Sequence, residues 1–147
     1  MGEPLTCTLS VPRSLQVGEP VELVFRLSNP TSQPLYVLNW HTPLEGLLND
    51  IFTVTRDGIE LPYQGEMVKR APPDASDYVL LAPGATVEAR VELSEAYDFK
   101  PPGTYQIEFH GPLMDVASKK AEVPHAWGES RPREVRCTPV EMTIVTG

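Results

Sequence analysis

The stretch VELVFRLS, residues 21–28, decides the fold class. Apolar side chains occupy every odd position, whereas Glu22, Arg26 and Ser28 occupy three of the four even positions. In an extended chain, successive side chains point to opposite faces, so this alternation places one face on a core and the other in water. The stretch therefore predicts a β-strand of an antiparallel sheet, in which one face commonly remains solvated.

Other segments extend this pattern along the chain. The alternation is strongest in residues 5–11, 87–93 and 105–110 and less regular in residues 35–40, 52–55, 59–61 and 78–81. Asp57-Gly58 predicts a tight hairpin turn, and Pro83-Gly84 predicts a type II turn. About eight short strands separated by turns are typical of an all-β, antiparallel immunoglobulin-like β-sandwich. We expect residues 1–147 to form a single domain of this class.

Three local features are predicted where these strands begin or end. Tyr105, after Pro102-Gly103-Thr104, is placed to form a tyrosine corner before the penultimate strand. Ser94 is predicted to cap a helical turn over residues 94–97. The apolar parity changes at Pro139, which predicts a β-bulge there.

The composition limits the classes of partner. The chain has 16 prolines, and its 12 basic and 20 acidic residues give a formal net charge of −8. The sequence has no basic patch and no apolar run of the ~20 residues that a membrane span needs, so we expect neither nucleic-acid binding nor membrane insertion. Residues 1–4 show no feature of a signal peptide, so the sequence leaves a cytoplasmic location open.

Two connections, residues 40–50 and 111–133, are longer than a sandwich requires. Long connections in compact domains are often functional, because a rigid scaffold can present their side chains to a partner. Aromatic and ionisable side chains in these connections are the predicted partner-binding residues: Trp40, His41, Glu45, His125 and Trp127. For Trp40, the alternative is packing into the core as the tryptophan of the sandwich.

The two cysteines have two interpretations. Cys7 and Cys137 lie on the inward phase of the predicted first and last strands. Immunoglobulin-like sandwiches often place these strands side by side, so a disulfide between the two residues is geometrically feasible. The simpler interpretation is a pair of buried thiols that pack as small apolar groups.

The sequence does not predict an enzyme. His41, His110 and His125 lack a second histidine at i+4, and zincin, nucleophile-elbow and Walker A motifs are missing. We therefore expect no catalytic residues, no metal and no cofactor. The alternative that stays open is a metal site formed by His41 and His125 near Asp50 or Glu45.

Seven stretches of the sequence form a recognisable series: residues 39–46 (NWHTPLEG), 50–58 (DIFTVTRDG), 62–65 (PYQG), 68–70 (VKR), 78–84 (YVLLAPG), 93–99 (LSEAYDF) and 102–105 (PGTY). In this order they resemble the N-terminal prodomain of secreted deuterolysin-like, lysine-specific zinc metallopeptidases. In that family a β-sandwich prodomain precedes a catalytic domain that carries the zinc-binding helix. The resemblance implies a secreted or periplasmic domain that folds against a peptidase and restrains it. The sequence contains no zinc-binding helix motif, so peptidase activity is not implied, and residues 111–133 have no counterpart in the family pattern.

Two function classes follow. The first is a non-catalytic protein-binding domain that restrains or inhibits a protease through its loops, with a zinc metallopeptidase as the partner that the resemblance implies. The second is a structural or assembly β-sandwich module of an extracellular or envelope complex without a protease partner. The second class predicts an exposed hydrophobic patch or a paired edge strand. The oligomeric state does not follow from the sequence.

Overall fold

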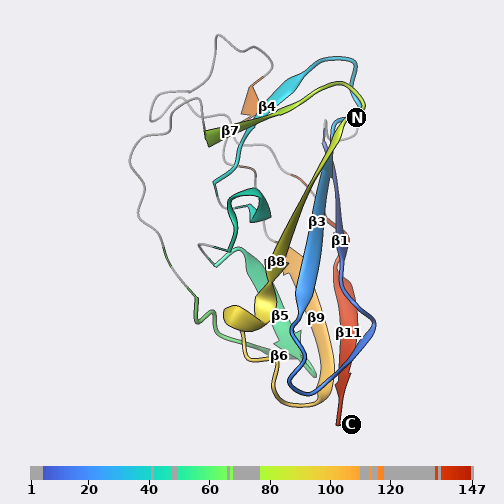
Figure 1. The fold of residues 1–147 in the computed structure, drawn as a ribbon, viewed down its shortest axis with the longest axis vertical. Helices are drawn as coiled ribbons and strands as arrows, with labels where there is room; N and C mark the ends of the chain where they lie inside the picture. Colours follow the sequence, from blue (N-terminus) through green and yellow to red (C-terminus); the bar gives the residue numbers. More distant parts are fainter. Residues whose placement is uncertain are drawn as a thin grey trace.

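A computed structural model describes residues 5–40, 42–47, 50–65, 67, 77–109, 113, 116–117, 135 and 137–146 (Figure 1). These residues form short strands and single turns of 3-10 helix, because no apolar pattern of helical period interrupts the alternation. In chain order the elements are β1 (Thr6–Ser10), β2 (Ser14–Gln16), β3 (Glu22–Ser28), β4 (Leu35–Leu38), η1 (Pro43–Glu45), β5 (Phe52–Arg56), β6 (Ile59–Glu60), β7 (Tyr78–Leu81), β8 (Thr86–Glu92), η3 (Leu93–Glu95), β9 (Gly103–Phe109), β10 (Val116–Ala117) and β11 (Val140–Val145).

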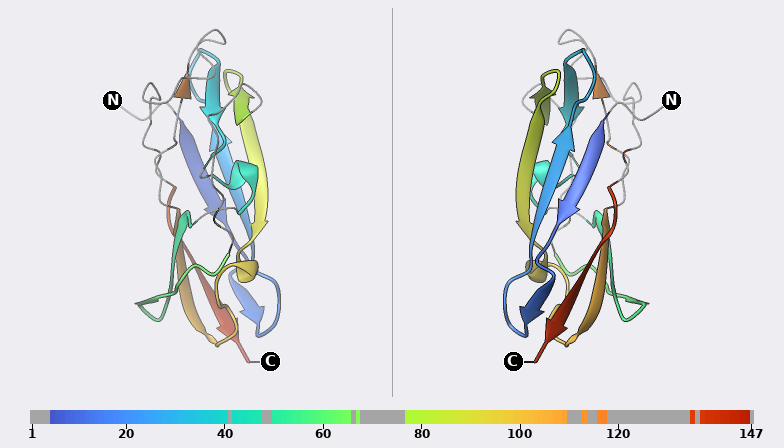
Figure 2. Two further views of the ribbon diagram at one scale, coloured as in Figure 1. Left: turned by 90° about the vertical axis from the view of Figure 1, so that its left-hand side faces the viewer. Right: turned by 90° about the vertical axis from the view of Figure 1, so that its right-hand side faces the viewer.

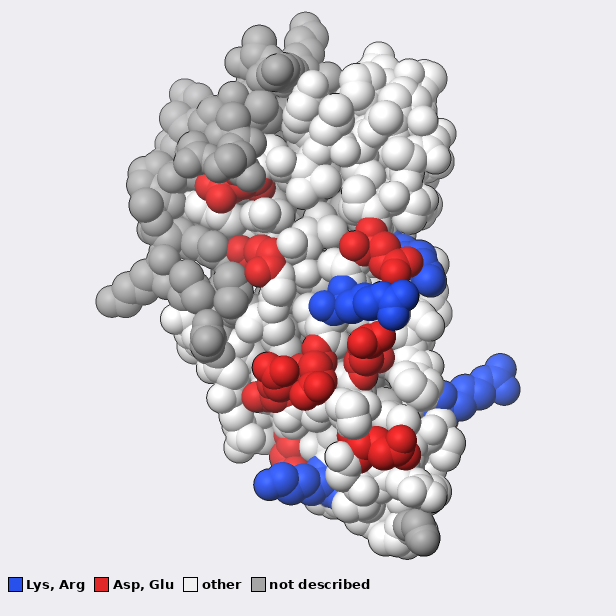
Figure 3. Space-filling view, in the orientation of Figure 1, with Lys and Arg blue, Asp and Glu red and all other residues white. Residues whose placement is uncertain are grey.

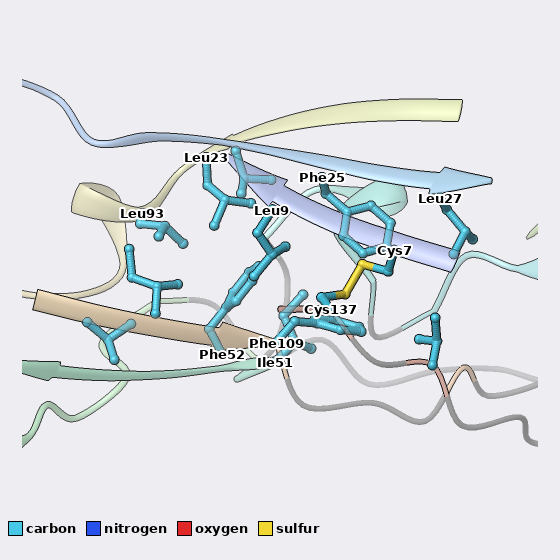
Figure 4. Close-up of a cluster of buried hydrophobic side chains, with 14 of the residues drawn as sticks. Cys7, Leu9, Leu23, Phe25, Leu27, Ile51, Phe52, Leu93, Phe109 and Cys137 are labelled. Carbon is cyan, nitrogen blue, oxygen red and sulfur yellow. A yellow bond between two sulfur atoms is a disulfide. The ribbon is translucent and has the colours of Figure 1, made fainter. Parts of the chain in front are cut away.

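The described strands form three sheets, with the strand orders β1-β3-β8, β10-β4-β7 and β2-β11-β9-β5-β6. The sheet that contains β4 and β7 lies towards one end of the molecule, and β5, β9 and β11 lie towards the other, while β3 and β8 run between them (Figures 1 and 2). Side chains of β3 pack against side chains of β9 across the core (Figure 4). The all-β, immunoglobulin-like sandwich predicted from the alternation is confirmed.

The turn η1 lies between two strands that belong to different sheets. β4 pairs with β10 and β5 pairs with β9, both antiparallel. The first pair belongs to the sheet β10-β4-β7 and the second to the sheet β2-β11-β9-β5-β6. The chain therefore passes from one sheet to the other between β4 and β5, and this connection contains η1.

The first and last strands depart from purely antiparallel pairing. β1 pairs antiparallel with β3, but after Pro12 the chain reaches β2, which pairs parallel with β11. Cys137 forms an isolated parallel bridge with Cys7 of β1, and from Val140 onward the chain pairs with β9. The change of apolar parity at Pro139 therefore coincides with a change of strand partner, rather than with the predicted bulge inside one ladder.

Both predicted turns are confirmed. Asp57 and Gly58, between β5 and β6, have positive φ angles of 51° and 86°, as a type I′ hairpin turn requires. Gly84 has a φ of 74°, and the Ala85 N–H donates to the Ala82 carbonyl at 2.9 Å, as expected for a type II turn. The first turn fixes the register of the β5–β6 pair. The second turn leads the chain from β7, which pairs with β4, to β8, which pairs with β3 in another sheet.

Aromatic rings form the centre of the core. Phe109 of β9 lies between Phe25 of β3, at 5.4 Å between ring centroids, and Phe52 of β5, at 5.7 Å (Figure 4). Nearby, Tyr105 stacks on Phe99 and its hydroxyl donates to the Pro101 carbonyl at 2.6 Å. This bond back to the chain before the strand confirms the predicted tyrosine corner.

A disulfide joins Cys7 to Cys137, with 4.7 Å between the Cα atoms (Figure 4). Both residues are buried, at 7% and 5% exposure, as their inward phase predicts. The structure therefore has the bonded pair and not the two separate thiols that were the simpler interpretation. The bond ties the first strand to the segment that leads into the last strand.

Candidate functional site

The η1 turn is built by its own sequence. The Leu44 N–H donates to the Thr42 hydroxyl at 3.1 Å, and this hydroxyl donates to the Asn39 carbonyl at 2.7 Å. Pro43 occupies the first position of the turn, where a missing N–H costs nothing. The turn ends at Gly46, which has a φ of 92° and whose N–H donates to the Pro43 carbonyl. The described part of the predicted 40–50 connection is therefore an ordered turn.

The η3 turn lies at the end of β8. It covers Leu93–Glu95, so the helical turn predicted over residues 94–97 is present but begins one residue earlier. Ser94 does not cap the turn, because its hydroxyl accepts a hydrogen bond from the Val21 N–H at 3.1 Å. The residue after the turn, Ala96, accepts a hydrogen bond from the Gln64 N–H at 2.7 Å. These two bonds hold η3 against the start of β3 and against the chain that follows β6.

A groove of about 640 Å³ lies between η1 and η3, and we name it the η1–η3 groove. Its lining residues are Gly46, Leu47, Gln64, Gly65, Arg90, Val91, Glu92, Glu95 and Ala96. A second hollow of about 510 Å³ adjoins it and shares Gln64 and Glu92. The further residues of this hollow include Glu19, Asp98 and Lys100. The two hollows therefore follow both sides of η3 and carry more acidic than basic side chains.

The charged groups beside the groove form exposed ion pairs. Arg90 contacts Glu22 at 3.0 Å and Glu88 at 3.2 Å, and Arg26 contacts Glu88 at 2.8 Å. The hydrogen bond from Arg26 lowers the pKa of the Glu88 carboxyl, and the hydrogen bond to Glu22 raises the pKa of Arg90. Glu92 and Glu95 form no such pair in the described part of the chain. Figure 3 shows acidic side chains on this face with basic side chains among them.

Tyr97, which follows η3 in the sequence, lines the second hollow. The Tyr97 hydroxyl donates to the Phe52 carbonyl and to Asp50 Oδ1, both at 3.0 Å, and its ring lies 5.6 Å from the ring of Tyr63. Tyr97 is 2% exposed. Burial, together with the charge of Asp50, raises the pKa of its hydroxyl well above the ordinary value. Tyr97 is therefore a neutral structural donor rather than a group that exchanges protons.

Replacing Tyr97 by phenylalanine is expected to lower the free energy of unfolding by about 1–2 kcal/mol, because the buried Phe52 carbonyl loses its donor and the partly buried hydrogen bond to the exposed Asp50 is lost. The raised pKa also predicts a pH effect. The folded state favours the neutral hydroxyl, so this contribution is complete below a pH of about 10 and declines as the pH rises further. In urea unfolding, the free energy of unfolding should decline less steeply between neutral and alkaline pH for Tyr97→Phe than for the wild type. Tyr36→Phe, at a half-buried tyrosine of β4, is the matched control and should change neither the stability nor its pH dependence by a comparable amount.

The structure places two of the five predicted contact residues. Trp40 is 6% exposed, which fits the alternative in which this side chain packs inside the fold. Glu45 is half-buried at the end of η1, next to Gly46 of the groove. His41, His125 and Trp127 lie outside the described residues, as does most of the predicted 111–133 connection. Their predicted roles, and a metal site at His41 and His125, stay predictions.

The groove-lining residues Gln64, Arg90, Glu92 and Glu95 were not singled out from the sequence. Gly46, Gln64 and Glu95 belong to three separate stretches that carry the metallopeptidase resemblance, residues 39–46, 62–65 and 93–99, and the structure brings all three to one groove. The sequence signal that could have predicted the groove was therefore the joint occurrence of these three stretches.

Among the residues placed by the structure, no group of three or more His, Cys, Asp or Glu side chains is arranged to hold a metal ion. The same part of the chain contains no helix long and apolar enough to cross a membrane.

Comparisons with known proteins give two matches. The sequence model of the immunoglobulin-like domain family matches residues 8–129. An extracellular protease of Aeromonas hydrophila is 32% identical over 106 residues, which are 72% of this chain and 30% of the length of that protein. The chain thus spans about a third of the relative that it matches, and the remainder of the relative lies outside the match.

Proposed function

The chain belongs to the immunoglobulin-like domain family, and on that premise we propose that it is a non-catalytic module that docks on an extracellular protease and restrains it. The observation that carries this proposal is the match to 30% of the length of a protein named an extracellular protease. In that relative, a segment similar to this chain is covalently joined to a much longer polypeptide. A sandwich in that position can fold against its neighbour and cover part of its surface.

The η1–η3 groove is the proposed docking surface. It draws residues from three stretches that resemble a peptidase prodomain, and the described parts of its walls are held by backbone hydrogen bonds at η1 and η3. A preorganised surface loses little conformational entropy on binding, which favours affinity. Glu45 would lie at the rim of this contact, and His41, His125 and Trp127 are the other predicted contact residues.

The charge of the groove indicates the kind of surface that it fits. Glu92 and Glu95 lie exposed along one wall, and Glu19 and Asp98 extend the acidic surface into the adjoining hollow. Acidic rims of this kind mainly accelerate association with basic surfaces and set the orientation of the two partners in the complex. We therefore propose that the protease presents basic side chains to this groove.

The disulfide supports an extracellular or periplasmic location for the proposed function. Disulfides persist in oxidising compartments and are rare in the cytosol of mesophiles. Cys7 and Cys137 are the only two cysteines of the chain, and they are bonded to each other. A secreted location would also bring the chain into contact with a secreted protease.

The test is direct binding of this chain to the extracellular protease of Aeromonas hydrophila, with turnover of a peptide substrate measured in parallel. We expect a saturable complex and slower turnover. The double variant Glu92→Gln/Glu95→Gln should bind about tenfold more weakly, mainly through slower association, and should lose the salt dependence of the wild type.

The matched control is Glu108→Gln/Glu141→Gln, which removes the same charge from exposed positions of β9 and β11. This control should bind as the wild type does. Equal weakening of both double variants would show a general charge effect and would contradict the groove as the docking surface. Neither complex nor slowed turnover with the wild type would contradict the protease partnership itself.

A further inference from the structure

The inner face of one sheet continues beyond the core of the sandwich. Residues that oppose one another in neighbouring antiparallel strands lie on the same face of the sheet, and Met142, Tyr105, Arg56 and Ile59 form one such row from β11 to β6. Met142 and Tyr105 are buried, at 1% and 0% exposure, Arg56 is half-buried, and Ile59 is 67% exposed. Ile59 therefore lies on the face that the core side chains use, but its own side chain is largely open to solvent.

Ile59 differs in exposure from the next apolar residue on the same face. The Leu61 N–H donates to the Val54 carbonyl at 2.8 Å, so Leu61 continues the hairpin ladder, and its side chain is half-buried against the core. The side views in Figure 2 show the tip of the β5–β6 hairpin projecting from the sandwich. The hairpin thus presents an apolar side chain at its projecting end.

The hairpin tip is held in place by the start of β9. The Asp57 N–H donates to the Thr104 carbonyl at 2.8 Å, and the Thr104 N–H donates to Asp57 Oδ1 at 3.0 Å. A Cβ atom at Gly103 would lie 2.8 Å from Asp57 Oδ2 and 3.2 Å from Arg56 Cγ, so this close approach needs glycine. These contacts fix the direction in which the tip projects, and a preorganised tip loses little conformational entropy when it binds.

We propose that the β5–β6 hairpin makes a second contact with the extracellular protease and that Ile59 is its anchor, which enters an apolar depression on the protease surface. The partner is the one of the proposed function, on which the role of the anchor therefore rests. The hairpin is close to the η1–η3 groove along the chain, because the five residues from Ile59 to Gln64 span at most about 18 Å. A partner with an interface of ordinary size can therefore cover both the groove and the tip.

The groove and the anchor should act on different rate constants. The carboxylates of Glu92 and Glu95 act over a distance and mainly accelerate association. The burial of Ile59 acts only in the formed complex, so truncation of this side chain should raise the dissociation rate and leave the salt dependence of binding unchanged. This difference distinguishes the anchor from the groove within one set of binding measurements.

The first test measures the association and dissociation rates of this chain on the immobilised extracellular protease of Aeromonas hydrophila. Ile59→Ala should dissociate about tenfold faster than the wild type, because it lacks most of the apolar surface that the complex buries. Ile59→Asp should bind about a hundredfold more weakly, because a carboxylate would enter an apolar depression. Thermal unfolding should show that both variants fold, since residue 59 is exposed.

Leu80→Ala is the matched control, because Leu80 is 52% exposed and lies in β7, towards the other end of the molecule (Figure 1). This control should bind as the wild type does. Wild-type binding by both Ile59 variants, or equal weakening by Ile59→Ala and Leu80→Ala, would overturn the anchor and leave the proposed function intact. A wild type that does not bind the protease would overturn the proposed function and the anchor with it.

A second pair of variants tests whether the fixed direction of the tip matters. Asp57→Asn keeps an oxygen acceptor for the Thr104 N–H and tolerates the φ of 51°, so its affinity should stay within about threefold of the wild type. Asp57→Ala loses the acceptor and disfavours this φ, so Ile59 is no longer held in one direction and the affinity should fall about tenfold. Wild-type affinity of Asp57→Ala would contradict the presentation of Ile59 by a rigid tip.

Discussion

Replacing both Cys7 and Cys137 by alanine is expected to lower the free energy of unfolding by about 5 kcal/mol. The two residues are 130 positions apart, so the bond closes a loop that contains most of the chain. In the chain-entropy account, a loop of this size restricts the unfolded state by about that amount. For a domain of this length, the change corresponds to a fall in Tm of about 15 °C.

Urea unfolding with and without a reducing agent checks this expectation. The reductant should lower the midpoint of the wild type to nearly that of the double variant, and it should leave the double variant unchanged. Alanine at the two buried positions removes little side-chain volume. The stability of the double variant therefore mainly reflects the loss of the bond, with a small contribution from changed packing. A wild type whose midpoint is insensitive to complete reduction would contradict the stabilising role of the bond.

The second large effect is expected from Phe109→Ala, at about 3–5 kcal/mol. Phe109 is 4% exposed, and its ring lies against Phe25 on one side and Phe52 on the other, so its removal leaves a cavity between the sheets. The cavity adds to the free-energy cost of the lost burial, because the rings that line the cavity come from separate strands and can close it only in part. Chemical denaturation of the variant gives the change in the free energy of unfolding.

Two variants separate the cavity from the loss of an aromatic group. Phe109→Leu keeps most of the volume and should cost about 1–1.5 kcal/mol. Ile59→Ala truncates an apolar residue that is 67% exposed in β6 and should change stability by less than about 0.5 kcal/mol. If Phe109→Ala were as mild as Ile59→Ala, the placement of Phe109 at the centre of the core would be wrong.

The strands could be predicted because their signal is local. In β3 and β9 most residues indicate by their polarity which face they occupy, with Val24 as an exception in β3. The turns at Asp57-Gly58 and Pro83-Gly84 can be predicted because glycine permits the φ angles that they require. The tyrosine corner also depends on a short segment, since the acceptor of Tyr105 lies four residues before it. These features need no knowledge of distant parts of the chain.

The features that escaped prediction depend on contacts between distant residues. β2 has three residues and too little alternation to reveal a strand, and its parallel partner β11 lies at the other end of the chain. The hydroxyl of Ser94 has a suitable position for a cap, but the N–H of Val21 competes for it successfully. The η1–η3 groove joins residues 46, 64 and 95, which no periodicity relates.

The disulfide has a consequence for a domain that is proposed to work beside a protease. Any single cut of the backbone between residues 7 and 137 would leave two fragments joined by a covalent bond. The cleaved molecule could therefore keep its sheets together, because neither fragment can diffuse away. On a denaturing gel the cut would become visible as two bands only after reduction. The bond thus makes the domain tolerant of nicking as well as stable.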